Sequence, residues 1–95
     1  MKRIFITGAS SGLGEALARE FSNEGVVLGL LARRLERLDL LASDLSGTVC
    51  NFSADVGDPL AMRAVAENFI RSVGVPDVVI ANAGISVGTM TSSVA

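Results

Sequence analysis

Residues 2–14 read KRIFITGASSGLG, and this stretch decides the fold. Lys2 to Thr7 is rich in β-forming residues, and a glycine- and serine-rich loop follows it at once. Beyond the loop, apolar residues recur at the spacing of a helix: Leu13, Ala16, Leu17 and Phe21. A strand that leads through a short glycine loop into a helix is typical of the first unit of a parallel sheet.

Short apolar runs and amphipathic stretches alternate along the rest of the chain. The run Val26–Ala32 is continuously apolar, which favours a strand buried on both faces. The Asp58-Pro59 pair favours a helix start, with aspartate as N-cap and proline at the first helical position. The expected strands are residues 2–7, 26–32, 49–54 and 77–81. The expected helices run from 13 to a closing Gly25, from 35 to 45 before Ser46-Gly47, and from 59 to 73.

Each crossover between these strands is long enough to carry a helix, so neighbouring strands should pair in parallel. Right-handed crossovers leave few arrangements. We therefore expect an α/β fold, a partial Rossmann-like doubly wound sheet with strand order 3-2-1-4 and three helices. In such sheets a ligand binds at the carboxyl edge where the strand order reverses. This places three loops together: Gly8–Gly14, Ala32–Arg34 and Asn82–Gly84.

Composition narrows the class of protein. The 95 residues are 49% apolar and 19% charged, which excludes disorder. A formal charge of −2 without histidine argues against a nucleic-acid or acidic-lipid partner. No apolar run approaches the ~20 residues of a membrane helix, and one cysteine without histidine cannot supply a structural zinc site. We therefore expect no membrane partner and no metal. The lone Cys50 fits a reducing compartment, so we expect a cytoplasmic chain.

The mean hydropathy of +0.52 is high for so small a domain. In the order 3-2-1-4 the fourth strand also lies at an edge, where unpaired backbone groups favour pairing with another chain. We therefore expect a homo-oligomer.

The loop Thr7-Gly8-x-x-x-Gly12-x-Gly14 carries the functional signal. Glycines at these points allow a tight turn and a close approach of backbone N–H groups to a pyrophosphate, and the helix N-terminus adds partial positive charge. A glycine-rich turn without a ligand is the alternative. The position between a strand and a helix favours phosphate binding. The spacing differs from Gly-x-Gly-x-x-Gly and lacks the Gly-Lys-Ser/Thr ending of a nucleoside triphosphate loop.

Together with Asp55-Val56 after the third strand and Asn82-Ala83-Gly84 after the fourth, this loop resembles the classical short-chain dehydrogenases/reductases. The resemblance covers residues 2 to about 88, and Ala81 stands where the family more often has a second asparagine. It implies an NAD(P)-binding Rossmann domain over residues 1–95, with strands and helices in 1–85 and, in 86–95, a tail where the next helix should begin. We expect this domain to be truncated.

The resemblance also implies a set of cofactor-binding residues. The glycine loop would meet the pyrophosphate, Asp55-Val56 the adenine, and Asn82-Ala83-Gly84 the ribose and nicotinamide side. Together with the other loop residues and the two arginines after the second strand, the expected cofactor-binding set is Gly8, Ser10, Ser11, Gly12, Leu13, Gly14, Arg33, Arg34, Asp55, Val56, Asn82, Ala83 and Gly84.

The end of the second strand indicates which dinucleotide binds. An NAD site needs a carboxylate there for the ribose 2′-hydroxyl, but this chain has Ala32 followed by Arg33 and Arg34. Arginine pairs with a 2′-phosphate through charge-assisted hydrogen bonds. We therefore expect NADP in preference to NAD. The alternative is that both arginines are ordinary charges at the start of a helix.

By the same resemblance, catalysis in the family uses a serine, a Tyr-x-x-x-Lys pair and an asparagine in the second half of the fold. This chain has no tyrosine, and Lys2 is its only lysine. We therefore expect no catalytic residue in it: it would be the cofactor-binding half of an oxidoreductase, inactive alone. A carbonyl or alcohol substrate would bind only if the missing half is present. A non-catalytic dinucleotide-binding module and an association module are the alternatives.

Overall fold

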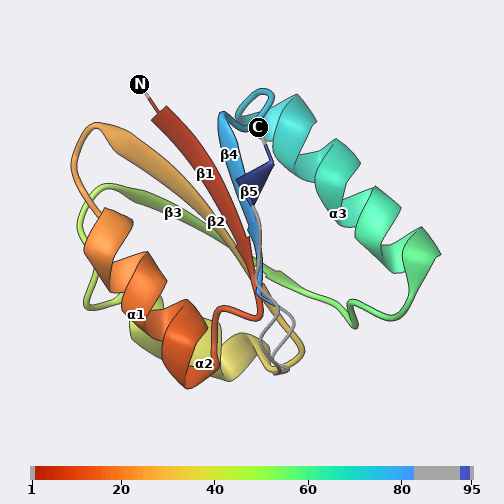
Figure 1. Cartoon of the computed structure of the whole chain (residues 1–95), viewed down its shortest axis with the longest axis horizontal. Coiled ribbons are helices and arrows are strands. Elements are labelled where there is room, and N and C mark those ends of the chain that lie inside the picture. Colours follow the sequence, from red (N-terminus) through yellow and green to blue (C-terminus); the bar gives the residue numbers. More distant parts are fainter. Residues whose placement is uncertain (1, 83–92, 95) are drawn as a thin grey trace.

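The computed structural model describes residues 2–82 and 93–94. Up to residue 81, strands and helices alternate along the chain (Figure 1), as the sequence predicts. The elements are β1 (Lys2–Thr7), α1 (Gly12–Phe21), β2 (Val26–Ala32), α2 (Leu35–Ala42), β3 (Thr48–Ser53), α3 (Pro59–Ser72), β4 (Val78–Ala81) and β5 (Ser93–Val94). Among the described residues, no helix combines the length and the apolar character that crossing a membrane requires.

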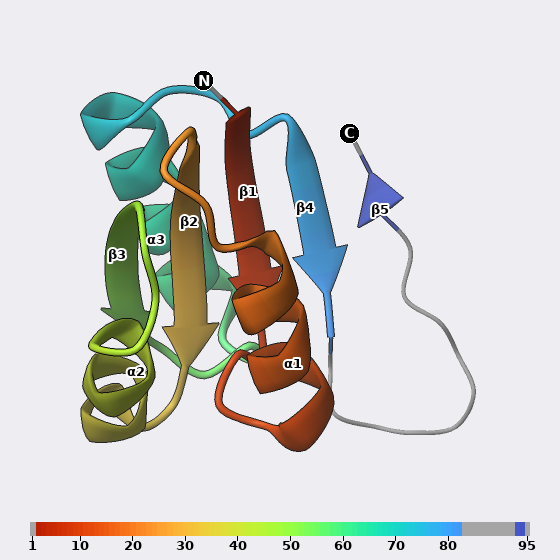
Figure 2. The same ribbon diagram turned by 90° about the vertical axis from the view of Figure 1, so that its left-hand side faces the viewer.

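The strands form one sheet in the order β3-β2-β1-β4-β5 (Figure 2). β1 pairs in parallel with β2 and with β4, and β2 pairs in parallel with β3. The predicted α/β fold with strand order 3-2-1-4 is confirmed. The expectation that the fourth strand lies at an edge of the sheet is wrong, because β5, an element that we did not predict, pairs antiparallel with β4 through Val79 and Val94. A two-residue strand is too short for an alternating pattern to reveal it.

Two helices end earlier than the sequence suggested. α1 stops at Phe21 and does not reach Gly25, because Ser22 adopts an extended conformation and its hydroxyl donates to the Ser46 carbonyl oxygen at 2.8 Å. α2 stops at Ala42, three residues before the predicted end. There the Ser43 hydroxyl donates to the Leu40 carbonyl oxygen at 2.7 Å and satisfies one of the last helical carbonyls.

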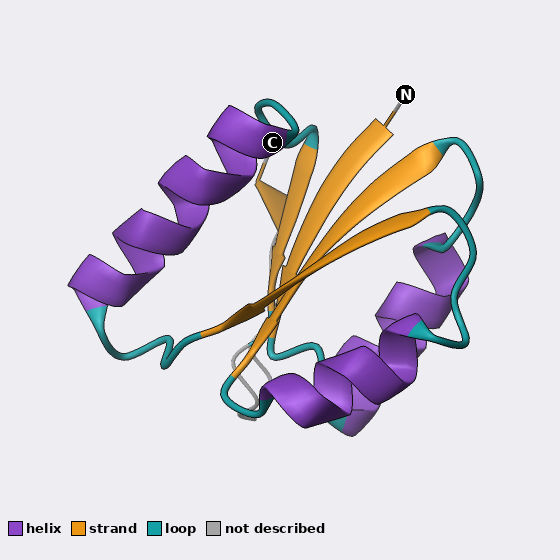
Figure 3. Ribbon diagram, turned by 180° about the vertical axis from the view of Figure 1, so that it is seen from behind, coloured by secondary structure: helices purple, strands orange, loops and turns teal. Residues whose placement is uncertain are grey.

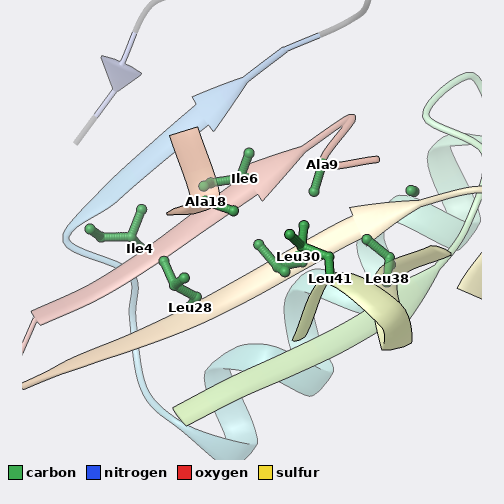
Figure 4. Packing of buried hydrophobic residues seen from close by; sticks show 9 residues of the cluster. Ile4, Ile6, Ala9, Ala18, Leu28, Leu30, Leu38 and Leu41 are labelled. Atoms are coloured by element: carbon green, nitrogen blue, oxygen red, sulfur yellow. The ribbon is translucent and has the colours of Figure 1, made fainter. Parts of the chain in front are cut away.

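The helices cover both faces of the sheet, α1 and α2 on one side and α3 on the other (Figure 3). Aliphatic side chains fill the layer under α1 and α2 (Figure 4): Ile4, Ile6, Ala9, Ala18, Leu28, Leu30, Ala32, Leu38 and Leu41. Aromatic rings fill the layer under α3, where Phe5 and Phe69 meet edge to face at 5.2 Å. Gly29 of β2 makes room for them, since a Cβ there would lie 2.7 Å from Cε1 of Phe69.

Candidate functional site: a basic cavity at the carboxyl edge of the sheet

The loop between β1 and α1 is held in place by backbone contacts that only glycine permits. Gly8 has a φ of +67°, and a Cβ there would collide with the backbone carbonyl oxygen of Asn82. A Cβ on Gly14 would collide with the carbonyl oxygen of Gly8 and lie 2.8 Å from Cα of Ala9. Both glycines are therefore required by the fold itself.

Gly12 is different. A Cβ at this first residue of α1 would meet nothing within 4 Å, and the residue is exposed. The described fold therefore gives no packing reason for glycine at this position. A ligand that approaches the backbone closely would supply such a reason.

Asn82, directly after β4, joins the end of that strand to the glycine loop. Its backbone N–H donates to Oγ1 of Thr7 at 3.1 Å, and its side-chain Nδ2 donates to Oγ of Ser11 at 3.0 Å. The Ser11 hydroxyl in turn donates to the Gly8 carbonyl oxygen at 2.9 Å, and its oxygen accepts the N–H of Gly14 as the N-cap of α1. Asn82 is only 7% exposed. Its hydrogen bonds therefore fix the shape of the glycine loop from the buried side.

A cavity of about 590 Å³ opens beside this loop, at the carboxyl ends of the strands. Of the predicted site residues, eight line it: Gly8, Ser10, Ser11, Arg33, Arg34, Asp55, Val56 and Asn82. Apolar residues at the end of β2 and directly after β3 also line it: Leu31, Ala32 and Ala54. The structure thus brings together residues separated by up to 74 positions, and the volume lies in the range of small-molecule and cofactor sites.

Three further predicted residues do not line the cavity. Gly12, Leu13 and Gly14 form the first turn of α1, with Leu13 61% exposed and Gly14 buried. Ala83 and Gly84 lie outside the described residues. A role in binding a cofactor stays a prediction for all thirteen residues.

The two aspartates after β3 have separate tasks. Asp58 caps α3, as predicted, because its Oδ1 accepts the N–H groups of Leu60 at 3.1 Å and Ala61 at 3.2 Å. Asp55 lines the cavity, and its Oδ1 accepts the N–H of Gly57 at 2.8 Å. That hydrogen bond fixes the turn that presents Asp55 at the edge of the cavity.

Arg37 also lines the cavity, although its sequence pattern did not indicate a site residue. Its only signal was its place four residues after Arg33, at helical spacing. The lining thus contains three arginines and one aspartate, a net charge of +2. Within the described part of the chain, none of these three guanidinium groups forms an ion pair or a side-chain hydrogen bond.

Arg19, on the outer face of α1, shows what a partnered arginine looks like in this molecule. Its guanidinium contacts the carboxylates of Glu15 at 3.0 Å and Asp44 at 3.4 Å. The hydrogen bond with Glu15 is the main cause that raises the pKa of Arg19. Among the described residues the arginines of the cavity have no such partner, so the site can accept an anion with polar and apolar parts.

The profile of the short chain dehydrogenase family matches residues 2–95. This chain belongs to the short-chain dehydrogenase family. It is 37% identical over 89 residues to a fatty acyl-CoA reductase of Mycobacterium tuberculosis, a match that covers 90% of this chain and 30% of the relative. It is also 36% identical over 85 residues to the NADPH-dependent pterin aldehyde reductase of Arabidopsis thaliana, covering 87% of this chain and 35% of that protein.

Solved structures of short-chain dehydrogenases have the same fold as this chain. The L-sorbose reductase of Gluconobacter frateurii, solved with NADPH and L-sorbose, superposes with a TM-score of 0.79 at 34% identity. That match covers 94% of this chain and 35% of the reductase. The chain therefore spans about a third of the length of the short-chain dehydrogenases that it matches.

Proposed function

We propose that this chain is the cofactor-binding part of an NADP-dependent short-chain oxidoreductase, an enzyme that transfers hydride between NADP(H) and a carbonyl or alcohol substrate. The observation that carries the proposal is the basic cavity at the end of β2, where Arg33 and Arg34 stand in place of a carboxylate. The NADPH in the L-sorbose reductase structure supports it, as does the NADPH-dependent pterin aldehyde reductase.

The residues present fit a dinucleotide. The first turn of α1 offers backbone N–H groups and a positive helix end to the pyrophosphate, and the open space at Gly12 leaves room for close approach. Arg33 and Arg34 offer donors to a 2′-phosphate, and Asp55 and Val56 border the place proposed for the adenine. The nicotinamide, when bound, supplies or accepts the hydride.

These residues bind and orient the cofactor, but none can act as the general acid or base of the family. The chain has no tyrosine, and Lys2 starts β1 at the edge of the sheet opposite the cavity. We therefore propose that residues 1–95 alone turn over no carbonyl or alcohol. We keep the cytoplasm as the proposed location, in line with the free thiol of Cys50.

Nucleotide titrations of the chain test the cofactor assignment. NADPH should bind roughly ten- to hundredfold more tightly than NADH, because a hydrogen bond to a charged group contributes ~1.5–3 kcal/mol. Arg33→Ala should remove most of this difference, and Arg33→Asp should reverse it. Ala32, at the end of β2, is a poorer position for this aspartate substitution, since its side chain is only 5% exposed and packs in the core.

Arg63→Ala is the matched control, because Arg63 is an exposed arginine of α3 that does not line the cavity. Its NADPH preference should equal that of the unmodified chain. Equal affinities for NADPH and NADH in the unmodified chain would contradict NADP as the cofactor.

We also propose that the chain self-associates. The supporting observation is an apolar hollow of about 410 Å³ between α3 and the sheet, bordered by Phe5, Ile70 and Val79. Ile70 is 45% exposed there, so covering it with a second copy would remove apolar surface from water. Sedimentation should show a mass that rises with concentration, and Ile70→Lys should reduce that rise. A monomer at all concentrations would contradict self-association.

A further inference from the structure

Arg37 occupies a junction between two hollows of the surface. It lies in the first turn of α2, where its N–H donates to the Arg34 carbonyl oxygen at 3.2 Å. It lines the cavity at the carboxyl edge together with Ser10 of the glycine loop. The same two residues also line a second hollow of about 390 Å³ between α1 and α2. Arg37 thus borders the cavity on the side where α2 faces the glycine loop.

The packing of α2 explains this position. Leu38 and Leu41 are 0% and 5% exposed and anchor the helix to the sheet. Arg37 precedes Leu38 by one residue, which turns it by about 100° around the helix axis from the buried side. It is exposed, and no described residue pairs with its guanidinium.

This arrangement carries an electrostatic cost that the fold offsets only in part, through Glu36 in the first turn of α2. Arg33, Arg34 and Arg37 surround the N-terminus of α2, where the helix dipole disfavours cations. The other two helices carry a cation at the favourable C-terminal end, with Arg19 in the last turn of α1 and Arg71 in the last turn of α3. In α2 the last turn holds no basic residue, and Arg34, as its N-cap, makes no side-chain capping bond. Three cations against one acidic residue at a helix N-terminus break this local rule, and such a departure indicates a functional site.

We propose that Arg37 is a specificity-determining residue, which binds the 2′-phosphate of NADP(H) together with Arg33. This assignment rests on the proposed function, since both residues belong to the same cavity. A phosphate monoester carries a charge of about −1.5 to −2 and three strong acceptor oxygens. One guanidinium fork saturates two of those oxygens at most, so a second arginine adds both charge and donors.

The test compares Arg37→Gln with Arg63→Gln, the same charge change on α3 outside the cavity. Nitrogen-15 NMR titrations in about 0.15 M salt, where distant charges are screened, measure affinities for NADPH, NADH, 2′,5′-ADP and 5′-AMP. Arg37→Gln should weaken NADPH and 2′,5′-ADP about three- to tenfold, the lower end for a charged hydrogen bond because the side chain is exposed. NADH and 5′-AMP should change by less than about twofold in this variant, as should all four ligands in Arg63→Gln.

The outcomes separate this inference from the proposal that it rests on. If the unmodified chain binds neither dinucleotide, or binds both alike, the proposed cofactor itself is wrong. If NADPH is preferred but Arg37→Gln leaves that preference unchanged, Arg37 does not contact the 2′-phosphate. Equal weakening of NADPH and NADH would make Arg37 a contact to a part that both nucleotides share. The unfolding temperature of Arg37→Gln should not fall, because the substitution removes a repelled charge.

Discussion

The two ends of the sheet use their charged groups differently. At the amino end, the Arg3 N–H donates to Oδ2 of Asp77 at 2.8 Å, the Asp77 N–H donates to the Arg3 carbonyl oxygen at 2.7 Å, and Nε of Arg3 donates to the Val73 carbonyl oxygen at 3.0 Å. At the carboxyl end, Arg33, Arg34 and Arg37 border a cavity without any such partner among the described residues.

This difference shows which polar groups serve the fold and which are available to a ligand. Arg3 joins the start of β1 to the end of α3, so its hydrogen bonds stabilise the chain without a cofactor. Within the described residues, the arginines of the cavity make no such stabilising hydrogen bond. They raise the local positive charge in a chain whose net charge is −2. Substitutions at the amino end should therefore change stability, and those in the cavity should change nucleotide affinity.

The largest effect is expected for Gly14→Val, which should lower the free energy of unfolding by about 3 kcal/mol or more, because its Cβ would overlap the backbone of Gly8 and Ala9. Gly25→Val is the control, since a Cβ on Gly25 meets nothing within 4 Å. Urea unfolding measures both. Similar midpoints for the two variants would show that the glycine loop is not packed as described.

Asp77→Ala breaks the contact at the amino end. It should cost about 1 kcal/mol of stability, because it removes an exposed charge-assisted hydrogen bond to the Arg3 N–H. NADPH affinity should stay the same, since Asp77 lies at the far edge from the cavity. Thermal unfolding and an NADPH titration on the same sample check both parts. A marked loss of affinity at unchanged stability would reverse the roles that we assign to the two ends.

Arg34→Ser should raise the stability of the chain and lower its affinity for NADPH. Serine supplies the N-cap that α2 lacks and removes a cation from the helix N-terminus, a gain of about 1 kcal/mol. NADPH affinity should fall, because a donor of the cavity is lost. Thermal unfolding and an NADPH titration of Arg34→Ser measure these two effects. A variant that gains stability and keeps its full affinity would assign Arg34 no role in the site.

Gly12→Ala is the smallest change. Alanine fits the open space at this helical position and should stabilise the chain by about 0.5 kcal/mol. Affinity for NADPH should nevertheless drop, because the added methyl group lies where the backbone would approach the pyrophosphate. Unchanged NADPH affinity in calorimetry would leave the glycine without a functional explanation.

Some features could be predicted from the sequence because a single physical pattern determines them. The bounds of β2 are those of an apolar run, Val26–Ala32, and Asp58-Pro59 marks the start of α3 through capping chemistry. Helix ends were less accessible. α2 stops at Ala42 because the Ser43 hydroxyl turns back onto a carbonyl oxygen, which hydrophobic periodicity does not report.

The site shows the same division. The motif residues Gly8, Ser11 and Asn82 were predicted as one group, and the structure joins them through hydrogen bonds. Arg37 was missed, because an exposed arginine in a helix has the same local pattern whether or not a cavity lies beside it. The structure also separates Gly14, which packing requires, from Gly12, which packing does not.

A map of NADPH-induced NMR shift changes over the backbone amides tests the difference between the two ends most directly. We predict that the changes cluster at the carboxyl edge, at Gly8, Ser11, Gly12, Arg33 and Asp55. The amides of Arg3, Gly25, Gly47 and Asp77, at the amino end, should not move. NADH should shift the amide of Arg33 less than NADPH does. Shifts concentrated at the amino end, or spread evenly over both ends, would contradict the assignment of the cavity as the cofactor site.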